Sequence, residues 1–192
     1  MPERPPRCIA PGAMQTQPLP ATGRIAKPIV LVGLMGAGKS TVGRRLAHRL
    51  GLAFVDADEE IEVAAGMTVS EIFDRFGEPY FRDGERRVIA RLIDGTPKVI
   101  ATGGGAFIND ETRDLILRET TAIWLDADPA VLAERVRRRD TRPLLRGRDP
   151  LTVLSELARV RDPVYAEAPI RVESRQAPHD ATVNAILEAI GH

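Results

Sequence analysis

Residues 29–50 read IVLVGLMGAGKSTVGRRLAHRL, and this stretch decides the fold. Its first part is short, apolar and β-branched, as is typical of a strand that is buried on both faces. The spacing of Val42, Leu46 and Leu50 predicts a helix over 38–50. We therefore expect a strand, a glycine loop and a helix in that order.

The glycine loop matches a phosphate-binding pattern. Residues 33–40, GLMGAGKS, fit G-x-x-x-x-G-K-[ST] at every position, and the expected strand and helix supply the context that the motif requires. Backbone N–H groups of such a loop surround a β-phosphate at the positive end of the helix dipole. Lys39 is expected to bridge β- and γ-phosphate oxygens, and Ser40 to ligate Mg²⁺. The alternative is a glycine turn that binds nothing, and the coincidence of motif and context favours binding.

Composition and charge narrow the class of protein. The chain has 192 residues, 43% of them hydrophobic, so one well-buried domain is expected. Its 27 basic and 27 acidic residues give zero net charge, which argues against nucleic acid or an anionic membrane as a partner. Apolar segments fall far short of the roughly 18 residues of a membrane span. The single cysteine, Cys8, excludes an intrachain disulfide and a cysteine metal site, and it fits a soluble protein of the reducing cytoplasm.

Residues 1–27 differ in character from the rest of the chain. Prolines at positions 2, 5, 6, 11, 18 and 20, together with a lack of periodicity, predict a disordered extension. The segment has no apolar core of a secretory signal, and Met14 is an alternative start. Residues 28–192 are expected to form a single domain.

Strand and helix patterns alternate along residues 28–192. After the strand at 28–33, short apolar runs predict strands at 53–56, 98–102, 121–126 and 170–172. Helical spacing predicts further helices at 58–65, 69–76, 78–94, 110–119, 128–138, 151–166 and 180–190. Such alternation is typical of an α/β fold in which helices cover both faces of a five-stranded parallel sheet.

A phosphate loop alone does not define the reaction, because GTPases, helicases, transport ATPases and small-molecule kinases share it. Base recognition in GTPases needs Asn-Lys-x-Asp after a later strand, and the sequence has none. Residues 74–77, DRFG, resemble D-x-x-G but fall in a predicted helix. A GTPase switch is therefore disfavoured.

Two carboxylates follow the strand at 53–56. Asp56 and Asp58 are two residues apart, so in extended geometry both can face the crevice at the carboxyl end of that strand. One could hold Mg²⁺ through water, and the other could accept a hydroxyl group. The alternative is that Asp58 merely caps the following helix.

Arg82 and a triple glycine are candidates for substrate binding. Arg82 lies three residues before Glu85, so the two side chains can form an ion pair on one helix face. The guanidinium group of Arg82 could instead bind a substrate carboxylate through two hydrogen bonds. Gly103, Gly104 and Gly105 follow the strand at 98–102 and leave backbone amides open to a ligand, although a plain turn is the alternative. The neighbouring arginines of the same helix, at 86, 87 and 91, are expected to form a solvated face.

Seven arginines lie between residues 135 and 148. They could form a solvated loop or a nucleic-acid patch, but beside a phosphate loop they favour a lid that closes over a triphosphate and excludes water. Arg161 follows in a predicted helix, where a surface charge is the alternative to binding, and Asp162-Pro163 is expected to bend or end that helix.

The ordered set of motifs resembles the shikimate kinase family. GLMGAGKST is followed by DAD, by FR with a glutamate three residues on, by GGG, by RPLL and by R-x-P-x-Y, over about residues 28–190. The resemblance implies a P-loop NTPase of the nucleoside monophosphate kinase type, with a helical substrate-binding insertion at about 58–95 and a mobile lid at about 137–150. It implies a monomer that transfers the γ-phosphoryl group of ATP, with one Mg²⁺ ion, to the 3-hydroxyl of shikimate in aromatic amino acid biosynthesis.

The resemblance also assigns roles to residues. It implies that the catalytic residues are Lys39, Asp58 and Arg142. It implies that Asp58 contacts the ring hydroxyls as the candidate base, that Arg82 and Arg161 clamp the carboxylate, and that Gly104 donates its backbone amide. A site of two arginines, one aspartate and an amide matches a small carboxylate with vicinal hydroxyls.

For the nucleotide, the resemblance implies a cradle made of Gly36, Ala37, Gly38, Lys39, Ser40 and Thr41. Arg142 would reach the phosphates, Arg135 would flank the adenine, and Arg175 lies near the expected adenine loop. Ser40 would bind Mg²⁺ directly and Asp56 through water, with Asp126 as the alternative. A kinase of another small hydroxy acid such as gluconate, and an ATP-dependent nucleic-acid binding module, are the rival functions.

Overall fold

The computed structural model describes residues 25–137, 145, 147–174 and 178–192. Nearly all of the expected extension at 1–27 and most of the expected lid lie outside the described residues. Arg142 and Arg175, with the roles expected of them, lie outside as well.

Five parallel strands form one sheet in the order β2-β3-β1-β4-β5. Their bounds are β1 (Ile29–Val32), β2 (Ala53–Asp56), β3 (Lys98–Ala101), β4 (Thr121–Asp126) and β5 (Ile170–Glu173). The register places Leu31 opposite Ala101 on one side and Ile123 on the other. The four side chains of β1 are fully buried, which explains why this central strand is apolar throughout. The five predicted strands are confirmed.

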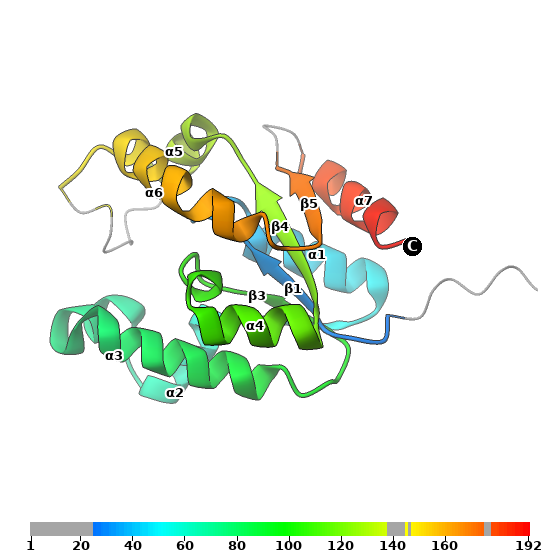
Figure 1. The fold of residues 1–192 in the computed structure, drawn as a ribbon, viewed down its shortest axis with the longest axis horizontal. Coiled ribbons are helices and arrows are strands. Elements are labelled where there is room, and N and C mark those ends of the chain that lie inside the picture. Colours follow the sequence, from blue (N-terminus) through cyan, green and yellow to red (C-terminus); the bar gives the residue numbers. More distant parts are fainter. Residues whose placement is uncertain (1–24, 138–144, 146, 175–177) are drawn as a thin grey trace, which may run out of the picture.

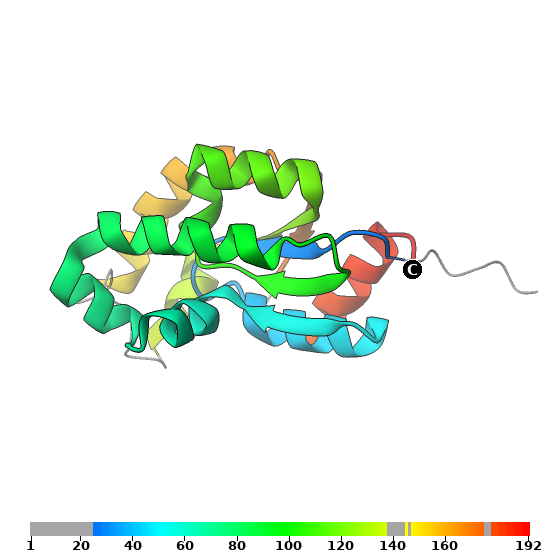
Figure 2. The same ribbon diagram turned by 90° about the horizontal axis from the view of Figure 1, so that it is seen from below.

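Helices cover both faces of the sheet. They are α1 (Lys39–Leu50), α2 (Ala57–Ala65), α3 (Val69–Leu92), the 3-10 helix η1 (Ala106–Ile108), α4 (Asp110–Glu119), α5 (Pro129–Arg137), α6 (Pro150–Tyr165) and α7 (His179–Ala189). Helices α1 and α7 lie on one face, while α4 and the second half of α3 lie on the other (Figures 1 and 2). The three-layer α/β/α fold is therefore confirmed. Among the described residues, no helix combines the length and the apolar character that crossing a membrane requires.

Helix α3 is broken where the sequence predicts a gap between two helices. Gly77 has φ 80° and ψ 174°, which no helix accommodates, and Pro79 lies in the first turn after this break, where a proline is tolerated. The first half of α3 and α2 project together from one end of the sheet (Figure 1). This projection forms one wall of the site described below.

Helix α6 agrees with the helix predicted at 151–166. It does not end at Asp162-Pro163 but continues to Tyr165, where the Ala166 N–H donates to the Asp162 carbonyl. A proline in the last turn removes only one intrahelical hydrogen bond, so the turn persists. Arg161 and Tyr165 therefore share one rigid helical turn.

The carboxyl ends of β1, β2 and β3 meet at one edge of the sheet. The phosphate loop follows β1, the Asp56-Ala-Asp58 turn follows β2, and the three glycines follow β3. Ligands in open α/β sheets bind at this edge, where neighbouring loops diverge. The fold thus brings three of the sequence motifs together.

The contact between α1 and the sheet leads to a stability prediction. A Cβ at Gly43 would lie 2.6 Å from Cε2 of Phe54 and 3.2 Å from Cδ1 of Leu31, whereas a Cβ at Gly84 of α3 would meet nothing within 4 Å. Gly43→Ala should lower the free energy of unfolding by about 1 kcal/mol, because crowding outweighs the gain in helix propensity. Gly84→Ala should raise it by about 0.5–1 kcal/mol. Chemical denaturation of both variants tests this, and stabilisation by both would contradict the packing described.

Candidate active site

The phosphate loop depends on glycines at three positions. Gly33, Gly36 and Gly38 have φ values of 131°, 83° and 92°, which side chains rarely permit. At Gly33 a Cβ would also lie 2.5 Å from the Leu125 carbonyl oxygen. Helix α1 begins directly afterwards at Lys39, so its first N–H groups open toward the loop.

Lys39 lies inside the loop. Its side chain donates to the carbonyl oxygens of Gly33 at 2.7 Å and Leu34 at 2.9 Å, and the residue is only 8% exposed. The ammonium group is thus held at the inner side of the turn, where a charge-assisted hydrogen bond is strong. This places a cation where the motif predicts one.

Asp56, the last residue of β2, and Asp58 differ in their roles in the structure. Asp56 is the N-cap of α2, because its Oδ1 accepts from the Asp58 N–H at 3.1 Å. The alternative that Asp58 merely caps this helix is therefore wrong, since the last residue of the strand takes that position. Both residues line a cavity of about 980 Å³, together with Ser40 of α1.

Arg82 and Glu85 form a largely buried ion pair on α3. Arg82 Nη1 donates to Glu85 Oε2 at 2.8 Å, and its Nε and Nη2 donate to Glu78 Oε1 at 3.1 and 2.9 Å. Glu85 is 2% exposed, and its Oε1 has no hydrogen-bond partner among the described residues. Burial raises the pKa of Glu85, which the nearby Arg82 opposes.

The glycine run after β3 lies between these charged groups. A Cβ at Gly103 would be 2.7 Å from Glu85 Oε1 and 2.8 Å from Asp58 Oδ1, and a Cβ at Gly105 would overlap the Arg82 guanidinium. A side chain at either position would displace the carboxylates of Asp58 and Glu85 or the guanidinium group of Arg82, so the glycines leave room for these charged groups beside the end of β3. A plain flexible turn does not explain this close contact on two sides.

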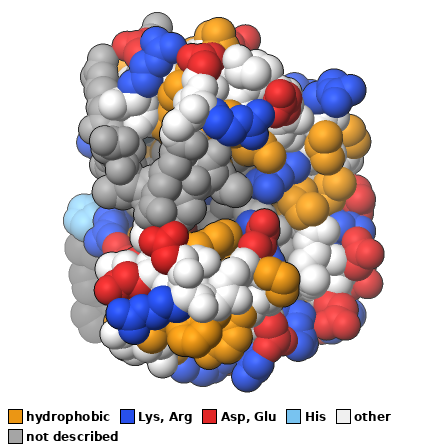
Figure 3. All heavy atoms as spheres, turned by 90° about the vertical axis from the view of Figure 1, so that its left-hand side faces the viewer, with side chains coloured by type: hydrophobic (Ala, Val, Ile, Leu, Met, Phe, Trp, Pro, Cys, Tyr) orange, Lys and Arg blue, Asp and Glu red, His pale blue; other side chains and the backbone are white. Residues whose placement is uncertain are grey.

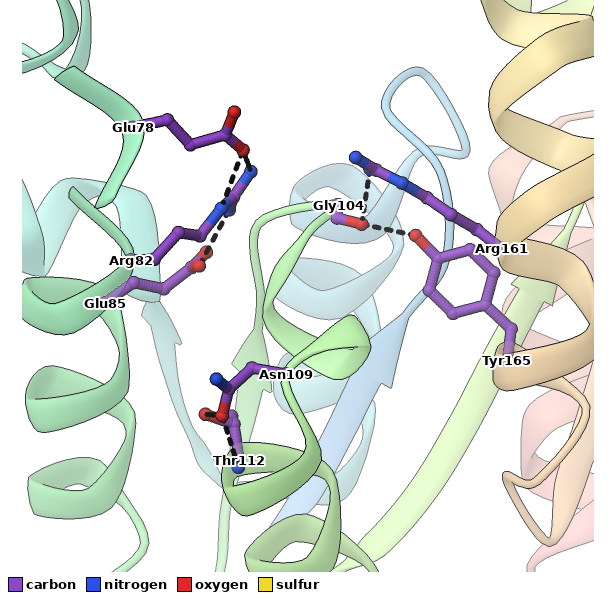
Figure 4. A network of polar contacts seen from close by, with 8 residues as sticks. All are labelled: Glu78, Arg82, Glu85, Gly104, Asn109, Thr112, Arg161 and Tyr165. Atoms are coloured by element: carbon purple, nitrogen blue, oxygen red, sulfur yellow. Dashed lines mark hydrogen bonds and ion pairs between the residues drawn. The ribbon is translucent and has the colours of Figure 1, made fainter. Parts of the chain in front are cut away.

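Gly104 is anchored from the opposite wall. Its carbonyl oxygen accepts from Arg161 Nη1 at 3.0 Å and from the Tyr165 hydroxyl, both on α6 (Figure 4). Tyr165 is fully buried, with Trp124 and Phe107 rings 6.0 and 6.4 Å away. Burial raises the pKa of Tyr165 to about 12, so the hydroxyl remains a donor at neutral pH.

Arg82 and Arg161 thus reach the cavity from different helices, with the glycine run between them (Figure 4). The space-filling view toward this end of the molecule shows a hollow bordered by side chains of both charges (Figure 3). Two guanidinium groups that converge on one cavity suit an anion such as a carboxylate.

Arg135 and Asp126 lie close to the phosphate loop but outside this cavity. Arg135 Nη1 donates to the Gly36 carbonyl and to Ser174 Oγ, both at 3.2 Å, and burial lowers its pKa. Asp126 accepts from Arg171 Nε at 3.1 Å and Nη2 at 2.6 Å. Asp56 lines the same cavity as Ser40, whereas Asp126 does not, and this favours Asp56 over Asp126 as a magnesium ligand.

Sequence reasoning missed three side chains of this region. The sequence predicts Glu85 only as an ion-pair partner of Arg82 on one helix face and Tyr165 only as part of a motif, and it gives no role to Ser174. The R-x-P-x-Y spacing could have indicated Tyr165, because Arg161 and Tyr165 are one helical turn apart.

Comparison with known proteins identifies the family. The family model described as shikimate kinase matches residues 35–191. The chain belongs to the shikimate kinase family. The shikimate kinase of Caulobacter vibrioides strain NA1000 is 62% identical over 165 residues, which cover 86% of this chain and 82% of that protein. The shikimate kinase of Bradyrhizobium diazoefficiens is 57% identical over 86% of this chain and 80% of its own length.

Solved structures agree with this family. Shikimate kinase from Acinetobacter baumannii in complex with shikimate superposes with a TM-score of 0.83 and 37% identity, over 87% of this chain and 94% of that one. A gluconokinase from Sinorhizobium meliloti, at 24% identity and a TM-score of 0.56, shares the fold over 87% of this chain and 93% of its own. The predicted family and fold are therefore confirmed.

The buried tyrosine leads to a prediction for this kinase. Tyr165→Phe removes one of the two donors to the Gly104 carbonyl and should loosen the glycine run, so KM for shikimate should rise about tenfold or less with a smaller change in kcat. Tyr80→Phe, at a residue that is 58% exposed on α3, is the matched control. Steady-state kinetics with saturating ATP measure both. An unchanged KM in the Tyr165 variant would contradict the anchoring role.

Proposed function

We propose that this kinase transfers the γ-phosphoryl group of ATP to the 3-hydroxyl of shikimate, giving shikimate 3-phosphate and ADP. The observation that carries the proposal is the convergence of Asp58, Arg82 and Arg161 on one cavity, which Ser40 at the start of α1 also lines. Family membership supports the same acceptor. The product feeds aromatic amino acid biosynthesis.

On the acceptor side, each residue has a chemically matched role. Arg82 and Arg161 bind the carboxylate, Gly104 donates its backbone amide to it, and Asp58 contacts the ring hydroxyls. Glu85 is a positioning residue, because its carboxylate accepts a hydrogen bond from Arg82 Nη1 at 2.8 Å. This contact fixes the direction of the Arg82 guanidinium group. The Glu78 contact restrains the same guanidinium from the other side.

The reaction is driven mainly by positioning and electrostatics. Asp58 accepts the proton of the attacking hydroxyl, and Lys39 stabilises the charge on the transferring phosphoryl group. Residues 36–41 hold the phosphates of ATP, and Arg135 and Arg175 flank the adenine. The lid at about 137–150, with Arg142, excludes water. The γ-phosphoryl group is therefore transferred to the acceptor and not to water.

The residues present fit one Mg²⁺ ion. Among the described residues, no cluster of three or more histidine, cysteine or carboxylate side chains could hold a metal by itself. Mg²⁺ in kinases binds to one or two protein oxygens plus phosphates and waters, which suits the Ser40 hydroxyl and the Asp56 carboxylate. When bound, the ion neutralises charge on the β- and γ-phosphates.

Several broader properties belong to the same proposal. The kinase acts as a cytoplasmic monomer. It has no nucleic-acid or membrane partner, and the zero net charge of the chain supports this second point. Residues 28–192 form the single kinase domain, with the acceptor-binding region at about 58–95, and residues 1–27 form an extension outside it.

The rival functions are less well supported. A gluconate kinase would also use arginine and aspartate, but family membership favours shikimate as the acceptor. A nucleic-acid binding module would need a stripe of available cations, whereas Arg44, Arg45, Arg86, Arg91 and Arg148 pair with carboxylates on the described surface.

Release of ADP tests the function most simply. With ATP and Mg²⁺ present, we expect rapid ADP formation on addition of shikimate, and little with gluconate or without acceptor. Turnover of gluconate without turnover of shikimate would contradict the proposal. Salt-sensitive binding to DNA or RNA, in place of any kinase activity, would support the nucleic-acid alternative.

The carboxylate clamp leads to a charge-conserving test. Arg82→Lys keeps the positive charge but loses the planar fork, so KM for shikimate should rise at least about tenfold while KM for ATP changes little. Arg86→Lys, one turn further along α3 and paired with Asp83, is the matched control. An unchanged KM for shikimate in the Arg82 variant would count against the clamp.

The magnesium assignment is tested by comparing two aspartates. Asp56→Asn should raise the Mg²⁺ concentration needed for half-maximal turnover by about tenfold or more, because the variant loses a charged oxygen ligand. Asp126→Asn should shift it much less, since that carboxylate pairs with Arg171. A larger shift in the Asp126 variant would overturn the assignment.

A further inference from the structure

Ser174, directly after β5, contacts the phosphate loop and does not line the acceptor cavity. It is 2% exposed, and its hydroxyl donates to the Ala37 carbonyl at 3.0 Å. The same hydroxyl oxygen accepts from Arg135 Nη1 at 3.2 Å, and that nitrogen also donates to the Gly36 carbonyl at 3.2 Å. The Ser174 backbone N–H donates to the Asp126 carbonyl at 2.6 Å, which fixes the residue to β4.

Together with the Lys39 contacts, these hydrogen bonds restrain four carbonyls of the loop. Lys39 holds the carbonyls of Gly33 and Leu34, Arg135 holds that of Gly36, and Ser174 holds that of Ala37. Ser174 is the neutral donor in this set. Serine suits the position because its hydroxyl both donates to the loop and accepts from Arg135.

The direction of the Ala37 carbonyl determines the direction of the next amide. In a planar trans peptide the C=O and the following N–H point in opposite directions. The carbonyl of Ala37 points to Ser174, so the N–H of Gly38 points to the side of the loop away from Ser174. Amides on that side of a glycine loop at a helix N-terminus are the donors that a phosphate group needs.

We propose that Ser174 is a positioning residue for the nucleotide diphosphate, because its hydroxyl holds the Ala37–Gly38 peptide with the Gly38 amide directed at the phosphate. Through its hydrogen bond to Arg135, Ser174 also links α5 to the phosphate loop. Helix α5, which leads into the expected lid, and the loop that holds the phosphates are therefore connected by the same hydrogen bonds. The inference rests on the proposed function for its nucleotide and is independent of the acceptor.

Binding of MgADP to the full chain tests this role, measured by isothermal titration calorimetry. Ser174→Ala leaves the Ala37 carbonyl without its donor and should raise the Kd for ADP about threefold to tenfold. The Kd for shikimate should change by less than about twofold. Ser174→Thr keeps a hydroxyl and should restore at least part of the ADP affinity.

Thr120→Val is the matched control. Thr120 is also buried, and its hydroxyl donates to the Ile116 carbonyl at 2.6 Å, at the end of α4. This variant loses a hydrogen bond of the same kind outside the site and should bind ADP as the unaltered chain does. Thermal unfolding of each variant shows how much stability each substitution costs.

Three results would overturn the proposal. They are an unchanged ADP affinity in Ser174→Ala, an equal loss of ADP affinity in Thr120→Val, and an equal weakening of ADP and shikimate binding in Ser174→Ala. Because ADP binding needs no acceptor, the test stands whichever hydroxy acid the kinase phosphorylates. A failure to phosphorylate shikimate would contradict the proposed function alone.

Discussion

The lack of side chains at Gly103, Gly104 and Gly105 is the constraint on which the rest of the site depends. Asp58 and Glu85 approach Gly103 so closely that a Cβ would lie within 2.8 Å of each, and the Arg82 guanidinium covers Gly105. On the other wall, Arg161 and Tyr165 hold the Gly104 carbonyl. Charged side chains from α2 and α3 on one side and from α6 on the other can therefore reach the loop at the end of one strand.

This close packing also explains the electrostatics of the acceptor site. Glu85 is a buried carboxylate whose pKa is raised by desolvation, while Arg82 and Arg161 favour its charged form and Asp58 opposes it. The carboxylates of Glu78 and Glu85 hold the Arg82 guanidinium, and the Gly104 carbonyl holds that of Arg161, so both groups have a fixed direction at the cavity. The site is thereby arranged for a carboxylate ligand before one arrives, which lowers the reorganisation that binding requires.

Much of this arrangement follows from the sequence, for identifiable physical reasons. The strands are predictable because parallel strands buried on both faces must be apolar, and the phosphate loop is predictable because its glycines and lysine serve a local backbone geometry. The rule that ligands bind at the carboxyl edge then brings the Asp56-Ala-Asp58 turn and the glycine run to the same place.

Other features depend on contacts that no local pattern encodes. The Tyr165 hydroxyl and Gly104 are 61 residues apart, and Ser174 and Ala37 are 137 residues apart. Only the packing of α6 and β5 on the sheet decides which carbonyl each hydroxyl meets. Even the local choice between Asp56 and Asp58 as helix cap depends on where β2 ends, and helix boundaries are set by such caps rather than by periodicity.

A structure of the kinase with ADP and shikimate bound tests the central claim most directly. The account predicts the shikimate carboxylate between Arg82 and Arg161, its 3-hydroxyl within hydrogen-bond reach of Asp58, and the β-phosphate of ADP on the Gly38 amide. Shikimate bound elsewhere, or bound with its carboxylate directed away from both arginines, would contradict the account.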